Sequence, residues 1–493
     1  MLYLIQNDRQ YDYDVRAIAL AFFEREKIQE ISDQELPEDL GENRLCRLDF
    51  LEGEIQGLMT DAAGRTVTER VHCDYNDHKN CRNDVSRFLY RLFSAYTGRS
   101  LPWGMLTGIR PTKIIMGWME EDQDPDFLEQ RFMDTYLTDR QKARLCRTVA
   151  FHEKEILESH PFEEEYSLYV GIPFCPTTCL YCSFTSFPVS RFGDRMTDYL
   201  SALEKEISYT ARACAGRKMS TIYVGGGTPS ALDESSLSRL MEILYRNFPL
   251  DQVPEFTVEA GRPDSVTREK LRLLKDAGVT RISINPQTMH DETLRLIGRN
   301  HTVAQTIEAF SMAREEGFDN INMDMITGLP GEEIEHVHST LRQIRQLEPE
   351  NLTAHSLAIK RAANLNIEME RYKSLVKGST NDMLRLVDRC ARDMGMSPYY
   401  MYRQKNIPGN LENIGYSLPD RECLYNILIM EEKQDIIACG AGATTKYVFP
   451  EENRIERTES VKNLDHYIYR IDEMIDRKRK YLDSDGPVRF RRR

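Results

Sequence analysis

From about residue 166 onward, short runs rich in β-branched and aromatic residues alternate with longer segments whose apolar positions recur every three or four residues. The first pattern is typical of strands and the second of amphipathic helices. It predicts six strands, at residues 168–172, 221–224, 255–259, 281–285, 320–325 and 352–357. It predicts the intervening helices near residues 192–214, 233–246, 264–277, 302–316 and 332–346. This alternation indicates βα units around a parallel sheet.

The segments on either side of this core have different patterns. The first 160 residues open with a strand-like run, MLYLI, and continue with a helix around 15–26, strands between 44 and 74 and a helix near 84–97. Beyond about residue 375 the pattern predicts a helix around 381–394, turns rich in Asn, Gly and Pro, and a charged helix near 460–480. We therefore expect an α+β domain over 1–160, the βα core over 161–374 and a mostly helical domain over 375–493.

Length and composition agree with a multidomain globular protein. At 493 residues the chain exceeds the size of about 250–300 residues at which a single core stops growing. Hydrophobic residues make up 41% and charged residues 29%, which is ordinary for folded domains. The net charge of −14 repels phosphate backbones and disfavours nucleic-acid binding. The basic C-terminal cluster, Arg489 and Arg491–Arg493, is expected to be a solvated tail.

The N-terminus has neither a basic region nor an apolar stretch of the signal-peptide kind, and no run of 18 apolar residues occurs. We therefore expect a cytoplasmic protein without a membrane span. The cytoplasm keeps thiols reduced, so the eleven cysteines are expected to be separate thiols or ligands of a metal site, not a disulfide framework. Small buried hydrophobes explain the eight scattered ones: Cys46, Cys73, Cys81, Cys146, Cys214, Cys390, Cys423 and Cys439.

The other three cysteines lie within eight residues, directly after the first strand of the core. They are Cys175, Cys179 and Cys182 in the segment CPTTCLYC. Thiolates hold iron–sulfur clusters, and three of them leave one iron of a [4Fe-4S] cubane open to another ligand. The alternatives are a zinc site, which normally needs a fourth Cys or His nearby, and unrelated buried thiols. The spacing and the position after a strand favour the cluster.

Polar or glycine residues also stand where other predicted strands end. The glycines Gly225–Gly227 follow the second strand, where backbone without side chains can approach a ligand, although a tight turn is the alternative. Glu259, Gln287 and Asp324 lie at or near the ends of three further strands. Side chains at that edge of a βα barrel face a shared pocket. For any one of them, a surface salt bridge or a helix cap is the alternative.

The cysteine motif resembles that of the radical S-adenosylmethionine (SAM) superfamily, and the resemblance extends over residues 165–360. The chain is similar in particular to the oxygen-independent coproporphyrinogen oxidase group, through YVGIPFC, GGGTPS, TVEA, RISINPQ, GRNHT and NMDMITGLPG in the same order. The segments LPWGMLTGIRP, CPTTCLYCSF, HSLAIKR and YRQKN resemble the bacterial coproporphyrinogen dehydrogenases of the HemZ type. The resemblance is weak over residues 1–100.

This resemblance implies a six-stranded partial (β/α) barrel that binds a [4Fe-4S] cluster through the three cysteines and SAM through residues around it. The implied cofactor-binding residues are Tyr169, Tyr181, Gly226, Gly227, Thr228, Glu259, Gln287, Arg299 and Asp324. Two of them are also implied in catalysis. Tyr169 would lie near the SAM sulfonium, and Asp324 would bind the ribose or a second ligand.

The reaction implied is removal of hydrogen from a porphyrinogen propionate by a 5′-deoxyadenosyl radical, followed by loss of carbon dioxide to leave a vinyl group. The implied partners are coproporphyrinogen III and a low-potential electron donor such as flavodoxin or ferredoxin, and the chain is expected to act as a monomer. Substrate carboxylates need cationic partners. The candidates are Arg110, Lys360, Arg361, Arg403 and Lys405, each of which solvated surface charge also explains.

Two further functions remain open. The first is haem carriage. Oxidases of the group carry another cysteine two residues after the third cluster cysteine, where this chain has Phe184. The haem-chaperone relatives lack that cysteine too. A haem carrier would need an axial ligand, yet no histidine occurs between His355 and His466, so Met, Cys or Tyr would have to serve. The third possibility is a radical SAM enzyme with another tetrapyrrole substrate, such as a methylase.

Overall fold

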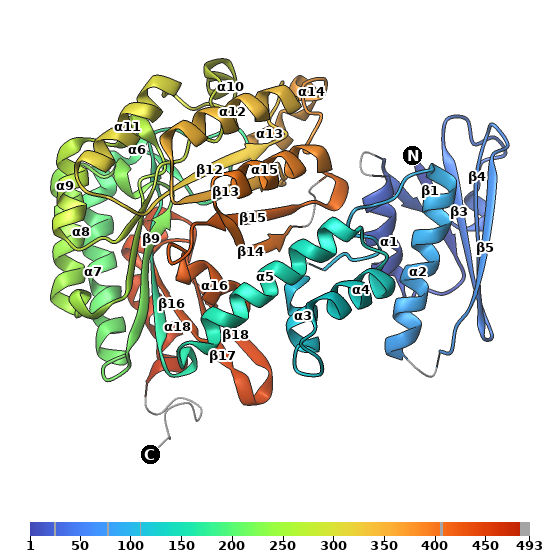
Figure 1. Ribbon diagram of the computed structural model, residues 1–493, viewed down its shortest axis with the longest axis horizontal. Helices are drawn as coiled ribbons and strands as arrows, with labels where there is room; N and C mark the ends of the chain where they lie inside the picture. The colour runs from blue at the N-terminus through green and yellow to red at the C-terminus, as the bar shows by residue number, and fades with distance from the viewer. Residues whose placement is uncertain (24–25, 76–77, 109, 405–407, 484–493) are drawn as a thin grey trace. The chain divides into compact units, whose positions relative to one another are not determined.

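The computed structural model describes residues 1–23, 26–75, 78–108, 110–404 and 408–483, and it divides into two compact units (Figure 1). The first unit contains Met1–Ala150, Ser379–Asn381 and Tyr402–Glu412. The second contains Phe151–Gly378, Asp382–Met401 and the chain from Asn413 onward. These units are defined by packing alone, so the three domains expected from the sequence, with boundaries near residues 160 and 374, stay a prediction.

The first unit is built on a five-stranded sheet with the order β2-β1-β3-β4-β5. Its strands are β1 Leu2–Gln6, β2 Ile28–Glu30, β3 Arg44–Leu51, β4 Glu54–Asp61 and β5 Thr66–His72. Helices α1 (Asp12–Phe22) and α2 (His78–Thr97) share one hydrophobic core with this sheet. Gly57 of β4 allows that close packing, because a Cβ there would lie 2.6 Å from the ring of Phe88. The α+β pattern expected for the N-terminal region is confirmed.

Three helices that the sequence pattern did not predict follow in this part of the chain. They are α3 (Thr112–Trp118), α4 (Pro125–Tyr136) and α5 (Arg140–Glu158). Helix α4 begins with a clear signal, since the Asp124 side chain accepts a hydrogen bond from the Asp126 N–H and Pro125 stands at the first helical position.

One cysteine expectation is wrong. Cys73 and Cys81 form a disulfide, with their Cα atoms 5.6 Å apart. Both sulfurs are buried in the core of the first unit, and the Tyr11 hydroxyl lies 3.1 Å from the sulfur of Cys81. Tertiary packing therefore brings two thiols together that the sequence spacing gave no reason to pair.

The second unit contains an eleven-stranded sheet with the order β14-β15-β13-β12-β11-β10-β9-β6-β16-β17-β18. The six predicted core strands are confirmed, and neighbours among them are parallel. They are β6 Tyr166–Ile172, β9 Met219–Gly226, β10 Glu255–Glu259, β11 Arg281–Ser283, β12 Ile321–Thr327 and β13 Asn351–Ser356. Among the described residues β13 does not pair with β6, so this parallel part is an open, partial barrel.

Helices connect these strands and cover the outside of the sheet, as Figure 1 shows. They are α7 Met196–Ala213, α8 Glu234–Asn247, α9 Arg268–Asp276, α10 Asp291–Leu296, α11 Val303–Glu315 and α12 Ile334–Leu347. The periodic apolar positions that predicted α8, including Leu237, Leu240 and Leu244, are fully buried.

The C-terminal part of the chain completes the large sheet. Its strands are β14 Ser397–Arg403, β15 Glu412–Ser417, β16 Asp435–Cys439, β17 Thr444–Phe449 and β18 Arg454–Glu459. Its main helices are α15 Asn381–Asp393, α16 Leu424–Glu431, α17 Leu464–Tyr469 and α18 Ile471–Leu482. Strand β16 is parallel to β6, with Ala438 opposite Tyr169, so it adds a seventh parallel strand that the sequence pattern did not reveal. No helix in the described ranges is long and apolar enough to cross a bilayer.

Candidate functional site

The cysteine loop leaves the carboxyl end of β6. Cys175 lies in the short strand β7 (Phe174–Cys175), and its sulfur is buried 3.4 Å from the Thr228 hydroxyl. Cys179 and Cys182 are partly exposed in the turn that follows, where the Cys182 N–H donates to the carbonyl of Cys179. Across the described chain, no three His, Cys, Asp or Glu side chains converge on a single metal position. A cubane makes a different demand, because each thiolate binds its own iron.

The glycine turn at the end of β9 holds this loop closely. The N–H groups of Gly227 and Thr228 donate to the carbonyls of Ile172 and Phe174, at 2.8 and 2.7 Å. A Cβ on Gly227 would lie 2.6 Å from the Phe174 carbonyl oxygen, and Gly226 has φ +112°, a conformation that side chains rarely allow. The glycines are therefore required for the contact between the turn and the cysteine loop.

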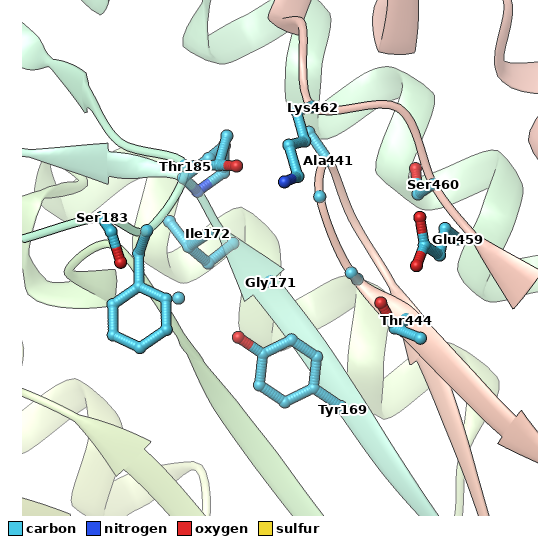
Figure 2. A pocket seen from close by; sticks show the side chains of 15 residues that line it. Tyr169, Gly171, Ile172, Ser183, Thr185, Ala441, Thr444, Glu459, Ser460 and Lys462 are labelled. Carbon is cyan, nitrogen blue, oxygen red and sulfur yellow. The ribbon is translucent and has the colours of Figure 1, made fainter. Parts of the chain in front are cut away.

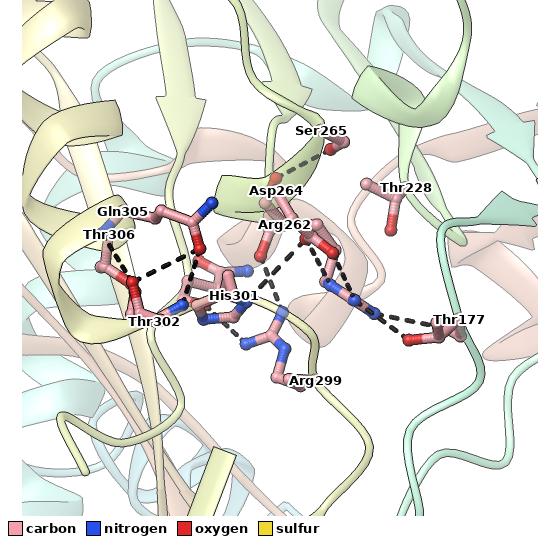
Figure 3. Close-up of polar contacts among 12 residues, drawn as sticks. Thr177, Thr228, Arg262, Asp264, Ser265, Arg299, His301, Thr302, Gln305 and Thr306 are labelled. Atoms are coloured by element: carbon pink, nitrogen blue, oxygen red, sulfur yellow. Dashed lines mark hydrogen bonds and ion pairs between the residues drawn. The ribbon is translucent and has the colours of Figure 1, made fainter. Parts of the chain in front are cut away.

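A buried arginine that the sequence analysis missed braces the same loop (Figure 3). Arg262 donates to the Thr177 hydroxyl at 3.0 Å and approaches the Cys179 sulfur at 3.7 Å. Asp264 holds the guanidinium in a two-pronged contact of 2.9 and 3.0 Å. A charged residue at or close to a strand end was the signal for Glu259, and the same signal could have identified Arg262, which follows β10 by three residues.

Gln287 has the most unusual backbone of the candidate residues. Its φ of +64° places a non-glycine residue in the left-handed region, which costs free energy and is concentrated at functional sites. The peptide is held on β12, because its N–H donates to the Asp324 carbonyl and its own carbonyl accepts from the Ile326 N–H, both at 2.9 Å. The side-chain oxygen is buried and has no hydrogen-bond partner among the described residues. This orphaned acceptor fits a polar ligand at the strand ends.

Two partly buried carboxylates at the strand ends have opposite pKa shifts. Burial raises the pKa of Glu259 to about 7, although the Tyr223 hydroxyl, which donates at 2.7 Å, partly lowers it. Burial also raises the pKa of Asp324, but His355 and the Asn322 amide outweigh that effect and bring it below its usual value. The Asn322 contact is 2.6 Å, and the His355 Nε2 lies 3.8 Å from the carboxylate. The site thus contains one firmly ionised carboxylate and one that titrates near neutrality.

Arg299 lies behind these strand ends. Its guanidinium donates to the carbonyls of Asn285 and Gly261, at 2.6 and 2.8 Å, while its Nε is buried without a partner among the described residues. Nearby His301 is buried, and neither ring nitrogen has a hydrogen-bond partner within the described chain, although its Nδ1 lies 3.8 Å from the Asp264 carboxylate. Burial and the charges of Arg299 and Arg262 lower the pKa of His301 to about 3. Arg299 therefore fixes the loops after β10 and β11.

Aromatic rings fill the centre of the barrel. Tyr169 of β6 and Tyr223 of β9 stack with centroids 6.2 Å apart, and Tyr425 of α16 stacks on Tyr223 at 4.5 Å. Burial, and secondarily the charge of Glu259, raises the pKa of Tyr169. Tyr181 is on the cysteine loop, where burial and then the charge of Cys179 raise its pKa well above the usual value. Neither Tyr223 nor Tyr425 was predicted as a site residue, and no local pattern marks Tyr425 as an interior residue.

The basic residues predicted to bind the substrate carboxylates lie in different environments. Lys360 lies with its amine 5.5 Å from the ring centroid of Phe184, and burial lowers its pKa. Arg361 is exposed. Arg403 belongs to the first compact unit, where it is buried and donates to the carbonyls of Leu106, Gly108 and Asn410. Its role there is structural. Arg110 is partly buried in the same unit, and Lys405 lies outside the described residues.

Comparison with known proteins identifies relatives of this chain. Residues 169–344 match the radical SAM superfamily, whose members use an iron–sulfur cluster and SAM. The oxygen-independent coproporphyrinogen-III oxidase-like protein HemZ of Bacillus subtilis is 38% identical over 410 residues, 82% of this chain and 82% of that protein. The heme chaperone HemW of the same organism is 38% identical over 195 residues, 39% of this chain and 51% of that protein.

Among solved structures, coproporphyrinogen III oxidase (HemN) from Escherichia coli, described as a radical SAM enzyme, superposes with a TM-score of 0.51 at 25% sequence identity. The match covers 66% of this chain and 73% of that one. The fold class expected from the sequence is thereby confirmed. The chain belongs to the radical SAM superfamily and, within it, to the family of the coproporphyrinogen-III oxidase-like protein HemZ.

Proposed function

We propose that the chain holds a [4Fe-4S] cluster on Cys175, Cys179 and Cys182 and uses it with SAM to decarboxylate coproporphyrinogen III oxidatively. The observation that carries this proposal is the loop of three thiols after β6, braced by Arg262 and by the glycine turn of β9. Three thiolates satisfy three irons, and the fourth iron would accept the amino and carboxylate groups of SAM.

The cofactor would lie across the carboxyl ends of β6, β9, β10 and β12. Gly226, Gly227 and Thr228 offer backbone at the closest approach of strand and cysteine loop. Glu259 supplies an acceptor for the SAM ammonium, and the unpartnered oxygen of Gln287 supplies another polar contact. Asp324, ionised beside His355, is suited to a ribose hydroxyl. We assign Arg299 to positioning these loops, because its guanidinium is engaged with backbone carbonyls.

The bound cofactor supplies the hard chemistry, an oxidising 5′-deoxyadenosyl radical that removes hydrogen from a propionate β-carbon. The protein must hold that carbon in place and keep water out. Loss of carbon dioxide then leaves a vinyl group, and one electron passes to an acceptor. Stacked Tyr169, Tyr223 and Tyr425 make the barrel interior aromatic and poor in water, which suits this role. A flavodoxin or ferredoxin is the proposed donor of the electron that starts each cycle.

The cluster is tested on protein reconstituted with iron and sulfide without oxygen. We expect a brown protein that releases 5′-deoxyadenosine from SAM under dithionite, and we expect Cys182→Ala to lose both properties. Cys390→Ala is the matched control, since Cys390 lies on α15 away from the cysteine loop. A colourless wild-type protein, or a Cys182→Ala variant with full iron content, would refute the cluster assignment.

The substrate is tested in the same preparation with coproporphyrinogen III. We expect the porphyrinogen to lose two molecules of carbon dioxide and four hydrogen atoms, two hydrogens for each propionate converted, and the product to carry two vinyl groups. If 5′-deoxyadenosine forms but the mass of the porphyrinogen does not change, another substrate must be sought.

The similarity to heme chaperone HemW supports a second candidate, haem carriage. Phe184 replaces the additional cysteine of the oxidases, as in the chaperones, which also favours it. Stoichiometric haem uptake with a shifted Soret band, together with unchanged coproporphyrinogen, would establish this candidate and exclude the first.

A further inference from the structure

A cavity of about 270 Å³ adjoins the cysteine loop in the second unit (Figure 2). One wall is the end of β6, including Tyr169 and Ile172, and a second is the Ser183–Thr185 segment that follows the last cluster cysteine. The turn between β16 and β17 and the segment after β18 close the other side. Tyr169 and Gly226 line this cavity and are also candidate SAM contacts, so a group bound here would adjoin the cofactor.

Hydrogen bonds hold the turn between β16 and β17 in place. The Gly440 N–H donates to the Glu206 carboxylate at 2.8 Å, and the Ala441 N–H donates to the Tyr199 hydroxyl at 3.2 Å. Glu206 is fully buried, and the buried Lys478 amine lies 2.9 Å from it. A buried ion pair anchors the wall from behind, so the cavity does not depend on a flexible surface loop.

Lys462 is the cation of this cavity. Figure 2 shows its amine directed into the space between Thr185 and Ala441. Within the described chain this amine has no ion pair or hydrogen bond. Glu459 also lines the cavity, but its carboxylate lies on the side of Ser460 and makes no ion pair with Lys462. The Ser460 hydroxyl is buried and lacks a hydrogen-bond partner in the described part of the chain.

The rest of the lining suits a ligand with an apolar ring system and a carboxylate side chain. Phe184 has 69% of its surface exposed and lines the cavity at the segment after the cysteines. The volume falls just below the range of about 300–1,000 Å³ for sites that enclose whole drug-sized ligands. A tetrapyrrole could therefore insert one side-chain-bearing corner, while its remaining rings stay outside the cavity.

We infer that Lys462 binds a propionate carboxylate of the tetrapyrrole in this cavity and so selects which corner of the ring lies beside the cofactor. This inference rests on the proposed function for the identity of the substrate. An ammonium with no carboxylate of its own, facing a partly enclosed cavity next to an exposed aromatic ring, is the partner such an anion requires. Thr185 and Ser460 provide hydroxyls around the same anion.

Binding of coproporphyrin III, the stable oxidised form of the substrate, tests this inference on the cluster-loaded protein. We expect Lys462→Met to weaken binding about 10- to 100-fold, the usual effect of losing a charge-assisted hydrogen bond. Lys462→Arg should bind within a few-fold of wild type. Lys433→Met is the matched control, because Lys433 is exposed like Lys462 but does not line the cavity. Coproporphyrin tetramethyl ester, which has no anion, should bind both methionine variants and wild type alike.

The inference is overturned if wild type does not bind coproporphyrin III, or if Lys462→Met binds it as tightly as wild type. Turnover is measured separately. A Lys462-dependent affinity without conversion of coproporphyrinogen III would refute the proposed function while the carboxylate site stands. Haem, which also carries propionates, is titrated in parallel, and a loss of haem affinity alone in Lys462→Met would identify haem as the source of the carboxylate.

Discussion

Glu255 and Glu259 are the same residue type on the same strand, β10, and their spacing of four places them on the same face of the sheet. Both are held in the barrel interior, but their partners differ. Glu255 accepts hydrogen bonds from the N–H groups of Leu424 and Tyr425, at 2.5 and 3.1 Å, and from the Cys423 thiol at 3.5 Å. Glu259 accepts from the Tyr223 hydroxyl and lies where β10 ends.

The difference shows how one strand can serve both structure and chemistry. The first N–H groups of α16 donate hydrogen bonds to Glu255, which therefore fixes the start of that helix. Glu259 instead lies at the end of the strand, where the charge of Asp324 acts on it and a ligand at the strand ends can reach its carboxylate. Position along the strand, not residue type, separates the two roles.

The largest expected effect is on stability, from Glu255→Ala. The change leaves the start of α16 without its acceptor and removes the carboxylate whose charge acts on the buried Arg281. We expect a loss of about 3 kcal/mol in the free energy of unfolding, measured by urea titration. The SAM dissociation constant of the remaining folded protein should stay within threefold of wild type. A larger change in SAM affinity than in stability would mean that the two glutamates do not divide their roles.

The reciprocal variant, Glu259→Gln, should keep the fold and lose cofactor affinity. We expect SAM to bind about 10- to 100-fold more weakly, because the neutral amide loses a charge-assisted hydrogen bond to the ammonium. Equilibrium dialysis on the cluster-loaded protein measures this, with Glu255→Gln as the matched control. Unchanged SAM affinity in Glu259→Gln would remove Glu259 from the cofactor site.

The pH dependence of SAM binding distinguishes the two positions further. Because burial raises the pKa of Glu259 to about 7, the carboxylate is protonated below that pH, and SAM affinity should fall by up to tenfold for each unit below it. The folded state also binds this proton more tightly than the unfolded chain, so Glu259 lowers stability as pH rises from about 4.5 to about 7. Both trends should vanish in Glu259→Gln. A pH-independent SAM affinity in wild type would show that Glu259 does not bind the ammonium in its ionised form.

The smallest expected effect comes from Tyr223→Phe. The lost hydroxyl no longer favours the ionised form of Glu259, so the pKa of Glu259 should rise and SAM affinity at pH 7 should fall about threefold. The stacked ring remains, so stability should change little. Tyr209→Phe, which removes a hydroxyl of α7 that donates to the Asp483 carboxylate at 2.8 Å, serves as the control for general effects of hydroxyl loss. An improved SAM affinity in Tyr223→Phe would contradict the hydrogen bond's proposed effect.

The sequence predicted the six parallel strands because each is a short apolar run with a periodic helix after it, and these patterns are local. It also identified the cysteine loop and the strand-end residues Glu259, Gln287 and Asp324, since position after a strand is visible in the sequence. A local sequence pattern does not predict which residues these side chains contact. The left-handed backbone of Gln287 depends on pairing with β12, which no local pattern records.

The residues that sequence analysis missed come from distant segments. Tyr425 contacts Tyr223 because α16 packs against β9. Strand β16 was not recognised because its partner β6 lies far earlier in the chain. The Cys73–Cys81 disulfide was missed for a different reason. The prediction of reduced thiols came from the redox state expected of the cytoplasm, which describes cysteines in general. It does not describe two particular cysteines whose sulfurs the core of the first unit brings together.

The pairing of β16 with β6 also orders events during synthesis. The ribosome releases the cysteine loop long before it makes Asp435–Cys439, so one edge of β6 stays open through much of translation. A nascent chain therefore presents its thiols beside an incomplete sheet. Iron delivered at that moment would meet a loop without its final support, which favours metallation after the full chain has left the ribosome.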